Sequence, residues 1–334
     1  MRFYVKYFAQ RLFQFLLVVI IGINLTYVIT HATPIDPVEQ SIAAVTSFGN
    51  TSPEAIAMMR QSLRELYGLT GGPAEQYLNF WRRIATADFG PSLSVFPTPV
   101  SLLIARALPW TIGLLATATL LSWALGNLLG GLAGYYQDRR SLKFVAILAM
   151  GLHPVPYYIV ALALLVMFGY VWPLLPISGG FGMNIEPGLT PTFVLSILKH
   201  SILPALSLML VGLGGWFLGM RSVVANVVNE DYVVYAELAG VGRRRILRSY
   251  VMRNALLPQI TGLALSLGAV FNGAIITEQV FGYPGVGALL ISAVYAGDYG
   301  LVLGVTTISI IGVSTAVLII DLVYPLLDPR VRTV

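Results

Sequence analysis

The sequence contains no cysteine and few charged residues. The absence of cysteine excludes disulfide bonds, thiolate zinc sites and thiol catalysis. Charged residues make up 10% of the 334 residues, whereas soluble domains typically carry about 25%. Because hydrophobic residues account for 57% of the chain, there is too little charge to cover a surface that faces water. The composition therefore predicts a protein that lies in lipid.

Patterns for catalysis and cofactor binding are also missing. The three histidines His31, His153 and His200 are scattered, which argues against a metal site. No Gly-x4-Gly-Lys-Ser/Thr phosphate loop is present, so we expect no ATPase site in this chain. The pair Gly240-x-Gly242 lacks the third glycine and the preceding strand of a dinucleotide site. We expect a chain that is not an enzyme and that holds no metal or cofactor of its own.

Long apolar stretches dominate the sequence instead. Each is close to the ~20 residues that a helix needs to cross the hydrocarbon core of a membrane. Helices are expected because an open sheet would leave backbone groups unpaired in lipid. The first stretch is too long for a typical signal peptide and lacks a clear cleavage site, which favours a retained span. We predict an all-α membrane protein with six transmembrane helices, at roughly Leu12–Thr30, Thr111–Gly134, Phe144–Tyr170, Ser201–Gly219, Ile260–Thr277 and Leu301–Tyr324.

The basic residues predict the orientation of these spans. Net charge is +5, and most of the 20 lysines and arginines fall on the side that holds both ends of the chain. Since short cytoplasmic loops carry an excess of Lys and Arg, both termini are predicted to be cytoplasmic. The charge therefore reflects topology rather than binding to nucleic acid. The basic residues on this side are Arg2, Lys6, Arg11, Arg139, Arg140, Lys143, Arg221, Arg243, Arg244, Arg245, Arg248, Arg253, Arg330 and Arg332.

This topology divides the chain into three parts. Residues 1–30 form a cytoplasmic start and the first span, and residues 31–100 form an extracytoplasmic segment. Residues 101–330 form a core domain with five spans and a long cytoplasmic loop at 221–257. Within the outer segment we expect one helix from Ser52 to Leu66 and another from Ala74 to Ala87, separated by a Gly-Gly-Pro break.

Small and polar residues mark special positions inside the spans. Gly126, Gly130 and Gly134 form a stripe that lets another helix approach closely, as a static packing surface or as one that slides during transport. Pro154 and Pro156 predict a break or kink in the third span. Ionisable and polar groups inside a membrane are functional candidates, but no ladder of carboxylates typical of proton-coupled carriers is present. The polar residues inside the spans are Asn24, Asn127, His153, Asn272 and Asp321.

The cytoplasmic loop predicts a short capped helix over Tyr232–Ala239. Asn229 or Asp231 suits the N-cap, and Gly240 stands where a C-terminal glycine cap belongs. Helical spacing places Tyr232, Tyr235, Ala236 and Ala239 along one side, suited to a groove in another protein. The residues from 242 to 258 predict an interfacial helix on anionic lipid, with an apolar face of Ile246, Leu247, Tyr250, Val251 and Leu257.

At these residues the sequence resembles a family. Asp231-Tyr232-Val233, Ala236, Ala239-Gly240 and Arg253-Asn254-Ala255-Leu256-Leu257-Pro258 resemble the coupling loop of permeases in binding-protein-dependent ABC importers. The spacing is similar to the oligopeptide and dipeptide branch. Val234 replaces the glutamate of the wider motif, so no role is carried over for that glutamate. Further matching segments are Pro34–Pro37, Asp88–Leu93, Ile202–Leu206, Glu278–Phe281, Pro284–Gly287 and Leu327–Arg332.

The resemblance implies a type I ABC importer permease fold in the cell membrane. It implies as partners a second permease subunit, one or two cytoplasmic ATPases that bind ATP and Mg²⁺, and an extracytoplasmic solute-binding protein. The solute is expected to be an oligopeptide or dipeptide, or an oligosaccharide; the alternative is a secondary transporter of a small solute, which would need coupling-ion residues.

The resemblance also assigns the candidate site residues. ATPase coupling falls to Asp231, Tyr232, Tyr235, Ala236, Glu237, Ala239 and Gly240. Support of the coupling loop falls to Arg253, Asn254 and Pro258. The proline- and glycine-rich loop after the fifth span is either a gate or a turn; its candidate gate residues are Phe281, Pro284, Gly285 and Gly287.

Overall fold

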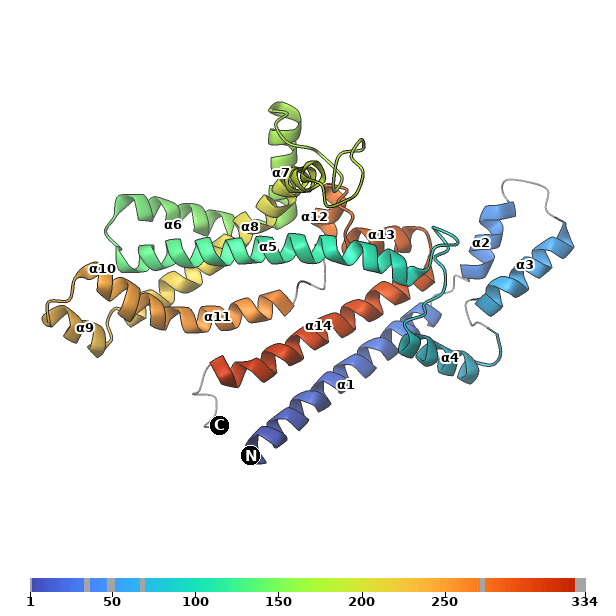
Figure 1. Cartoon of the computed structure of the whole chain (residues 1–334), viewed down its shortest axis with the longest axis horizontal. Coiled ribbons are helices and arrows are strands. Elements are labelled where there is room, and N and C mark those ends of the chain that lie inside the picture. The colour runs from blue at the N-terminus through green and yellow to red at the C-terminus, as the bar shows by residue number, and fades with distance from the viewer. Residues whose placement is uncertain are drawn as a thin grey trace. The chain divides into compact units, whose positions relative to one another are not determined.

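The computed structural model describes residues 2–32, 37–46, 52–66, 70–268, 270 and 274–327 (Figure 1). Within these residues every regular element is a helix, in agreement with the predicted all-α class. The chain forms two compact units, Met1–Trp110 with Gly285–Thr315 and Thr111–Pro284 with Ala316–Val334. The long helices α5 (Val100–Tyr135) and α14 (Tyr299–Leu327) contribute residues to both units.

Among the described residues, four helices are long and apolar enough to cross a membrane. They are α1 (Arg2–Ala32), α5, α8 (Pro191–Val227) and α14, and they correspond to the first, second, fourth and sixth predicted spans. Helix α5 begins at Val100, well before the predicted start at Thr111, and it continues through Pro109. Proline is tolerated there because transmembrane helices accommodate a lost backbone donor better than helices in water.

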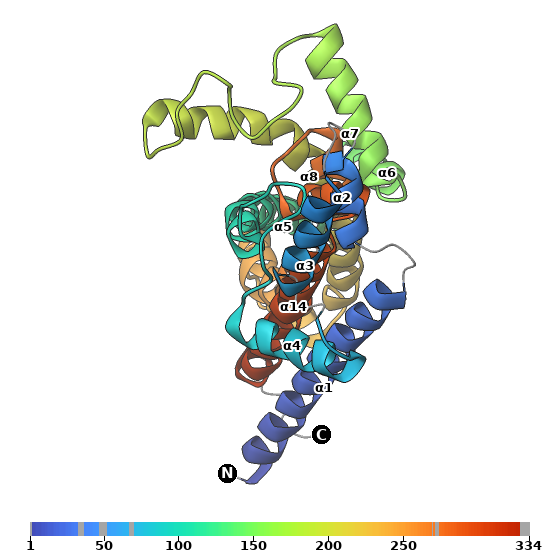
Figure 2. The same ribbon diagram turned by 90° about the vertical axis from the view of Figure 1, so that its right-hand side faces the viewer.

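The third predicted span is broken. Helix α6 (Arg140–Leu152) and helix α7 (Tyr157–Leu165), continued by the π-helix η1 (Val166–Val171), meet at an angle of 104°. Figure 2 shows α7 leaving α6 steeply. Pro154 and Pro156 lie in the break, so the kink predicted at these prolines is confirmed, and the bent pair provides a fifth apolar segment.

The fifth predicted span does not form one continuous helix within the described residues. Helix α11 (Arg253–Gly268) has 16 residues, and helix α12 (Ile275–Val280) follows it. Asn272, which sequence patterns place inside this span, lies outside the described residues, as do Pro34–Asp36 and the segment from Asp328 onward. Six spans therefore stay a prediction.

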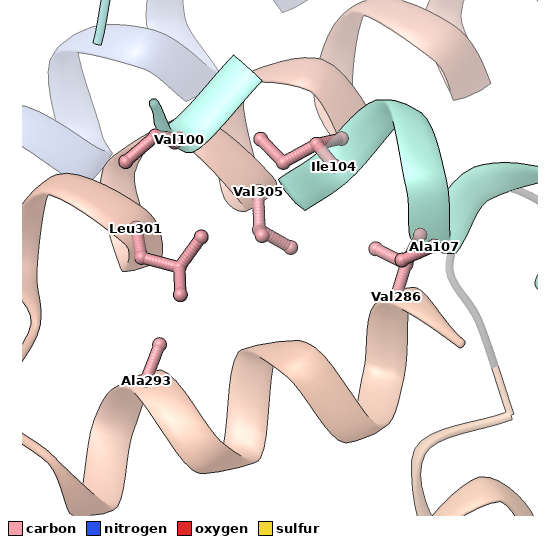
Figure 3. Close-up of a cluster of buried hydrophobic side chains, with 7 residues drawn as sticks. All are labelled: Val100, Ile104, Ala107, Val286, Ala293, Leu301 and Val305. Carbon is pink, nitrogen blue, oxygen red and sulfur yellow. The ribbon is translucent and has the colours of Figure 1, made fainter. Parts of the chain in front are cut away.

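The first unit has an apolar core where three helices meet (Figure 3). Helix α13 (Val286–Tyr295) packs there against the start of α5 and the start of α14. At Gly304 of α14 an added Cβ atom would lie 2.5 Å from Val100 Cγ1 and 3.2 Å from Ile104 Cδ1, so the glycine lets α14 approach α5 closely. The buried side chains of this core are Val100, Ile104, Ala107, Val286, Ala293, Leu301 and Val305.

Three short helices form the segment between α1 and α5: α2 (Pro37–Thr46), α3 (Pro53–Leu66) and α4 (Pro73–Thr86). The two helices predicted here are confirmed to within one residue at each end, whereas α2 was not predicted. Arg60 of α3 donates two hydrogen bonds to the Glu39 carboxylate of α2, at 2.6 and 2.9 Å. These hydrogen bonds lower the pKa of Glu39. Helices α2 and α3 also share a small buried cluster of Val38, Ile42 and Leu63.

Helix α8 is much longer than the predicted span Ser201–Gly219. It has 37 residues with Pro204 inside it, and Figure 2 shows its yellow-green first part turned away from the rest of the helix. Thr190 caps its start by accepting a hydrogen bond from the Phe193 amide at 3.3 Å, and Pro191 occupies the first turn. Helix α8 ends at Val227, and the next element, α9, follows directly after it.

Candidate coupling surface

The predicted short helix is present as α9 (Asp231–Leu238) and ends at a glycine cap. Gly240 has φ +75°, a left-handed conformation that favours glycine. The Gly240 amide donates to the Glu237 carbonyl at 2.9 Å, and the Val241 amide donates to the Ala236 carbonyl at 3.1 Å. This pair of hydrogen bonds is the Schellman motif, which satisfies carbonyl groups at a helix end. The motif fixes the direction in which the chain leaves α9.

The N-cap prediction is wrong. Glu230 occupies the cap position and makes no side-chain capping hydrogen bond. Asn229 precedes the cap position, and its Nδ2 donates to the Ala225 carbonyl of α8 at 2.9 Å. Asp231 is already inside the helix, where its carboxylate lies in the first turn and favours the positive end of the helix dipole.

One face of α9 is buried against its own chain. Val233 is 0% exposed and Ala236 is 6% exposed. They pack into a cluster that we call the loop core, formed with α8, with the π-helix η2 (Ile246–Met252) and with the start of α11. The prediction that Ala236 lies on the outward face is therefore wrong, because its small side chain lets α9 sit closely on this core. The other buried members of the loop core are Met220, Val224, Ile246, Val251 and Ala255.

The opposite face of α9 is apolar and exposed. Tyr235 is 69% exposed and Leu238 is 79% exposed, while Tyr232 and Val234 are 39% and 43% exposed. Asp231, Glu237, Ala239 and Gly240 are exposed around them. Aromatic and leucine side chains that gather on a short exposed helix are typical of a protein interface rather than of a surface that faces water alone. Leu238, which the sequence patterns did not single out, belongs to this face.

A hydrogen bond ties this face to the next helix. Asn254 Nδ2 donates to the Tyr232 hydroxyl at 3.1 Å and to the Tyr250 carbonyl at 2.7 Å. Of the other two predicted support residues, Arg253 is exposed at the start of α11 and Pro258 lies inside that helix. Asn254 of α11 therefore holds the Tyr232 side chain of α9 in place.

The interfacial helix predicted after α9 is instead continuous with α11. Helix α10 (Arg243–Arg245), η2 and α11 follow one another without a break. Ile246 and Val251, predicted to face lipid, are buried in the loop core. The segment thus anchors α9 to a long helix, and Figure 1 shows α9, α10 and α11 together at one end of α8.

Replacing Ala236 or Ala239 by arginine tests which face of α9 is buried. Ala236→Arg is expected to destabilise the loop core by about 3 kcal/mol or more, because it buries an unpaired charge. Ala239→Arg places the same charge on an exposed residue and is expected to leave stability nearly unchanged. Thermal unfolding in detergent measures both. Equal stabilities for the two variants would contradict the burial of Ala236.

The glycine stripe lies directly against α8, the helix that carries α9. A Cβ atom at Gly126 would lie 2.6 Å from Trp216 Cβ, and one at Gly134 would lie 2.8 Å from Val224 Cγ1. At Gly130 an added Cβ atom would collide with the Phe217 carbonyl oxygen. The absence of side chains at these glycines lets the backbones of α5 and α8 approach each other.

The candidate gate residues lie in different surroundings. Phe281 is 2% exposed and packs with Ala161 and Leu203, so it is a core residue in this conformation. Its carbonyl accepts a hydrogen bond from the Gly179 amide at 2.9 Å. Pro284 is exposed, whereas Gly285 and Gly287 are buried at the start of α13.

Two buried acids escaped the sequence analysis as site residues. Glu278 of α12 is 0% exposed, and its carboxylate accepts a hydrogen bond from the Thr111 hydroxyl at 2.7 Å. Asp298 is also 0% exposed and precedes α14. No group of three or more metal-ligating side chains occurs in the part of the chain that the structure describes. Thr111, a partner of Glu278, and Ser92, a partner of Asp298, lie 167 and 206 residues away, so no local spacing indicates these contacts.

The Asp298 carboxylate collects four hydrogen bonds. Its Oδ2 accepts from the Ser92 hydroxyl at 2.5 Å and from the amide and the hydroxyl of Ser94 at 3.0 Å each. Its Oδ1 accepts from the Leu301 amide at 3.0 Å, as an N-cap does. Asp298 thus fastens the loop before α5 to the start of α14.

The sequence is similar to those of known proteins. A family model described as "Binding-protein-dependent transport system inner membrane component" matches residues 126–333, more than half of the chain. The chain belongs to this family. It is therefore a multi-pass permease subunit of the cell membrane, and the matched range includes the glycine stripe and α9.

Similarity to individual relatives extends over nearly the whole chain. Identity is 29% over 318 residues with the oligopeptide transport system permease protein AppB of Bacillus subtilis (strain 168), covering 94% of this chain and 95% of that one. It is 30% over 339 residues with the probable D,D-dipeptide transport system permease protein DdpB of Escherichia coli (strain K12), covering 96% of each chain. It is 25% over 335 residues with the dipeptide transport system permease protein DppB of Lactococcus lactis subsp. cremoris (strain MG1363), covering 98% and 99%. The predicted resemblance to peptide permeases is confirmed.

Proposed function

We propose that this permease subunit takes part in the ATP-driven import of oligopeptides or dipeptides, and that α9 is its contact with a cytoplasmic ATPase. The printed names of the relatives support peptides over the oligosaccharides that the sequence also allowed. The family description supports an extracytoplasmic binding protein as the source of the solute. ATP and Mg²⁺ then belong to the ATPase, and this chain supplies part of the pathway.

The observation that carries the proposal is the exposed apolar face of α9. Tyr235 and Leu238 project from a helix whose other face is locked into the loop core. The Schellman cap at Gly240 and the hydrogen bond from Asn254 to Tyr232 hold the helix in one orientation. A rigid apolar face costs little side-chain ordering on binding, and so it suits a docking element that must transmit movement.

The proposed topology gives α9 its place. Both termini are cytoplasmic, six helices cross the membrane, and residues 31–100 lie outside. Residues 101–330 form the permease core, with the coupling loop at 221–257. A second permease subunit completes the pathway, with one or two ATPases bound to the pair. Phe281, Pro284, Gly285 and Gly287 are proposed to move when the pathway opens, and the buried position of Phe281 supports a closed conformation.

A charge on the exposed face tests the docking role. Leu238→Glu is expected to weaken ATPase binding by about 30-fold, since the loss of an interface anchor costs about 2 kcal/mol. Co-purification with the ATPase and peptide uptake into proteoliposomes that contain ATP measure the effect. Leu189→Glu is the matched control, because Leu189 is a leucine with full exposure (103%) in the loop before α8.

The Leu189→Glu control is expected to bind the ATPase and to take up peptide as the unaltered chain does. If Leu238→Glu binds the ATPase as tightly as the unaltered chain, α9 does not dock. If the unaltered chain takes up peptide without any ATPase, the proposed import mechanism is wrong.

A further inference from the structure

A cavity of about 600 Å³ lies between α5 and the helical segment that follows α9. It belongs entirely to the second unit. Next to it, the two sides touch: a Cβ atom at Gly131 would collide with Met252 Sδ. The cavity is lined by Leu128, Leu132, Leu247, Arg248, Ser249, Met252, Arg253 and Leu256.

The lining combines an apolar wall with two positive charges. Leucines from α5 and from the η2–α11 segment form the wall, and Leu128 is 51% exposed. Arg248 and Arg253 add two guanidinium groups at one side of the cavity. Among the described residues neither arginine forms an ion pair, while Arg60 and Glu39 do. The cavity therefore places two positive charges, without acidic partners in the part of the chain that the structure describes, beside an apolar wall.

We propose that this cavity binds one anionic phospholipid, with the phosphate on Arg248 and Arg253 and an acyl chain along the leucines. Guanidinium groups bind phosphate oxygens through paired, charge-assisted hydrogen bonds. Basic pockets between transmembrane helices are suited to anionic lipid headgroups. A free phosphate would leave the leucine wall exposed to water, so the combined lining selects a lipid. The site requires only that the chain lies in a membrane and does not depend on the transported solute.

The position of the cavity gives the lipid a consequence for the loop core. One side of η2 provides Leu247, Arg248 and Met252 to the cavity, and another side provides Ile246 and Val251 to the loop core. A lipid that bridges α5 and η2 therefore steadies the element on which α9 rests. Lipid binding and the orientation of the coupling helix share one structural support.

Lipid retention by the purified transporter tests the site. The full complex is extracted from its native membrane with mild detergent, and the phospholipid that remains is measured by mass spectrometry. Arg248→Gln with Arg253→Gln is expected to lower retained anionic phospholipid by about 30-fold, because each arginine contributes about a fivefold factor to binding. The matched control is Arg244→Gln with Arg245→Gln, which removes two exposed arginines that do not line the cavity.

Two further variants separate the lipid from other occupants. Leu132→Trp fills the cavity without changing charge and is expected to lower lipid retention while the complex stays monodisperse. Leu132→Cys introduces a single thiol, because the chain has no cysteine, and a cross-linker there reports whatever lies in the cavity. The expected cross-link is to a thiol-reactive analogue of phosphatidylglycerol added in phosphatidylcholine nanodiscs.

Three results would overturn the proposal. The first is equal lipid retention by the Arg248/Arg253 variant and the Arg244/Arg245 variant. The second is a cross-link from Leu132→Cys to the partner permease, which would show that a protein fills the cavity. The third is loss of the cross-link to the lipid analogue when inorganic phosphate alone is added before the reaction, which would show a simple anion site.

Discussion

Asp298→Ala is expected to destabilise the first unit by about 3 to 5 kcal/mol. The substitution removes the acceptor of four donor groups, which are the Ser92 hydroxyl, the amide and the hydroxyl of Ser94, and the Leu301 amide. Each buried donor left unpaired costs about 1–3 kcal/mol, and the loss of the N-cap of α14 adds about 1 kcal/mol. The apparent melting temperature of the purified chain in detergent, and the yield of monodisperse protein, measure the effect.

The matched control for this variant is Asp88→Ala. Asp88 lies in the same loop and its carboxylate accepts one hydrogen bond, from the Gly90 amide at 3.0 Å, at an exposed position. A loss of less than about 1 kcal/mol is expected there. If both variants melt at the same temperature, the carboxylate of Asp298 does not hold the loop.

Gly130→Leu is expected to separate α5 from α8 and to abolish both folded protein and transport. The first atom of any side chain at this position would meet the backbone of Phe217, which cannot move aside as a flexible side chain does. Overpacking a tight contact costs about 1–3 kcal/mol for small insertions, and a whole leucine side chain exceeds that range. Size-exclusion chromatography of detergent extracts gives the folded fraction.

Gly113→Leu provides the control in the same helix. An added Cβ atom at Gly113 has no neighbour within 4 Å. The substitution is therefore expected to keep the chain folded, since leucine favours a helix more than glycine does. Normal assembly by Gly130→Leu, or failure of both variants alike, would show that the glycine stripe is not a packing surface.

Composition and periodicity were sufficient for the class of the protein and for the existence of α9. Low charge and long apolar runs are averages over many residues, so single errors do not change them. The short helix was visible because Gly240 marks its end through backbone conformation alone. The direction of each face was not visible, because Val233, Ala236 and Tyr235 are all compatible with burial, and only the packing of η2 decides between them.

Contacts between residues that lie far apart in the sequence could not be predicted from local patterns. The segment Asp88–Leu93 was recognised only as a resemblance, although its parts have physical roles. Gly90 has φ +77°, Phe89 packs on the core of the first unit, and Ser92 donates to Asp298, which lies 206 residues away. Nothing in the spacing of Ser92 indicates such a partner. Hydropathy also does not distinguish one long helix from two shorter ones, so it did not indicate that α11 and α12 are separate helices within the fifth predicted span.

The part of α8 that carries α9 turns small rotations into displacements of the coupling face. The residues from Pro204 to Val227 span about 36 Å at ~1.5 Å per residue, and a pivot of about 10° at one end moves the other end by about 6 Å. Since α9 is mounted at the end of this segment through Met220 and Val224, a modest tilt carries the coupling face by about one helical turn. The tight seam with α5 at the three glycines would then set the angle through which this segment can swing.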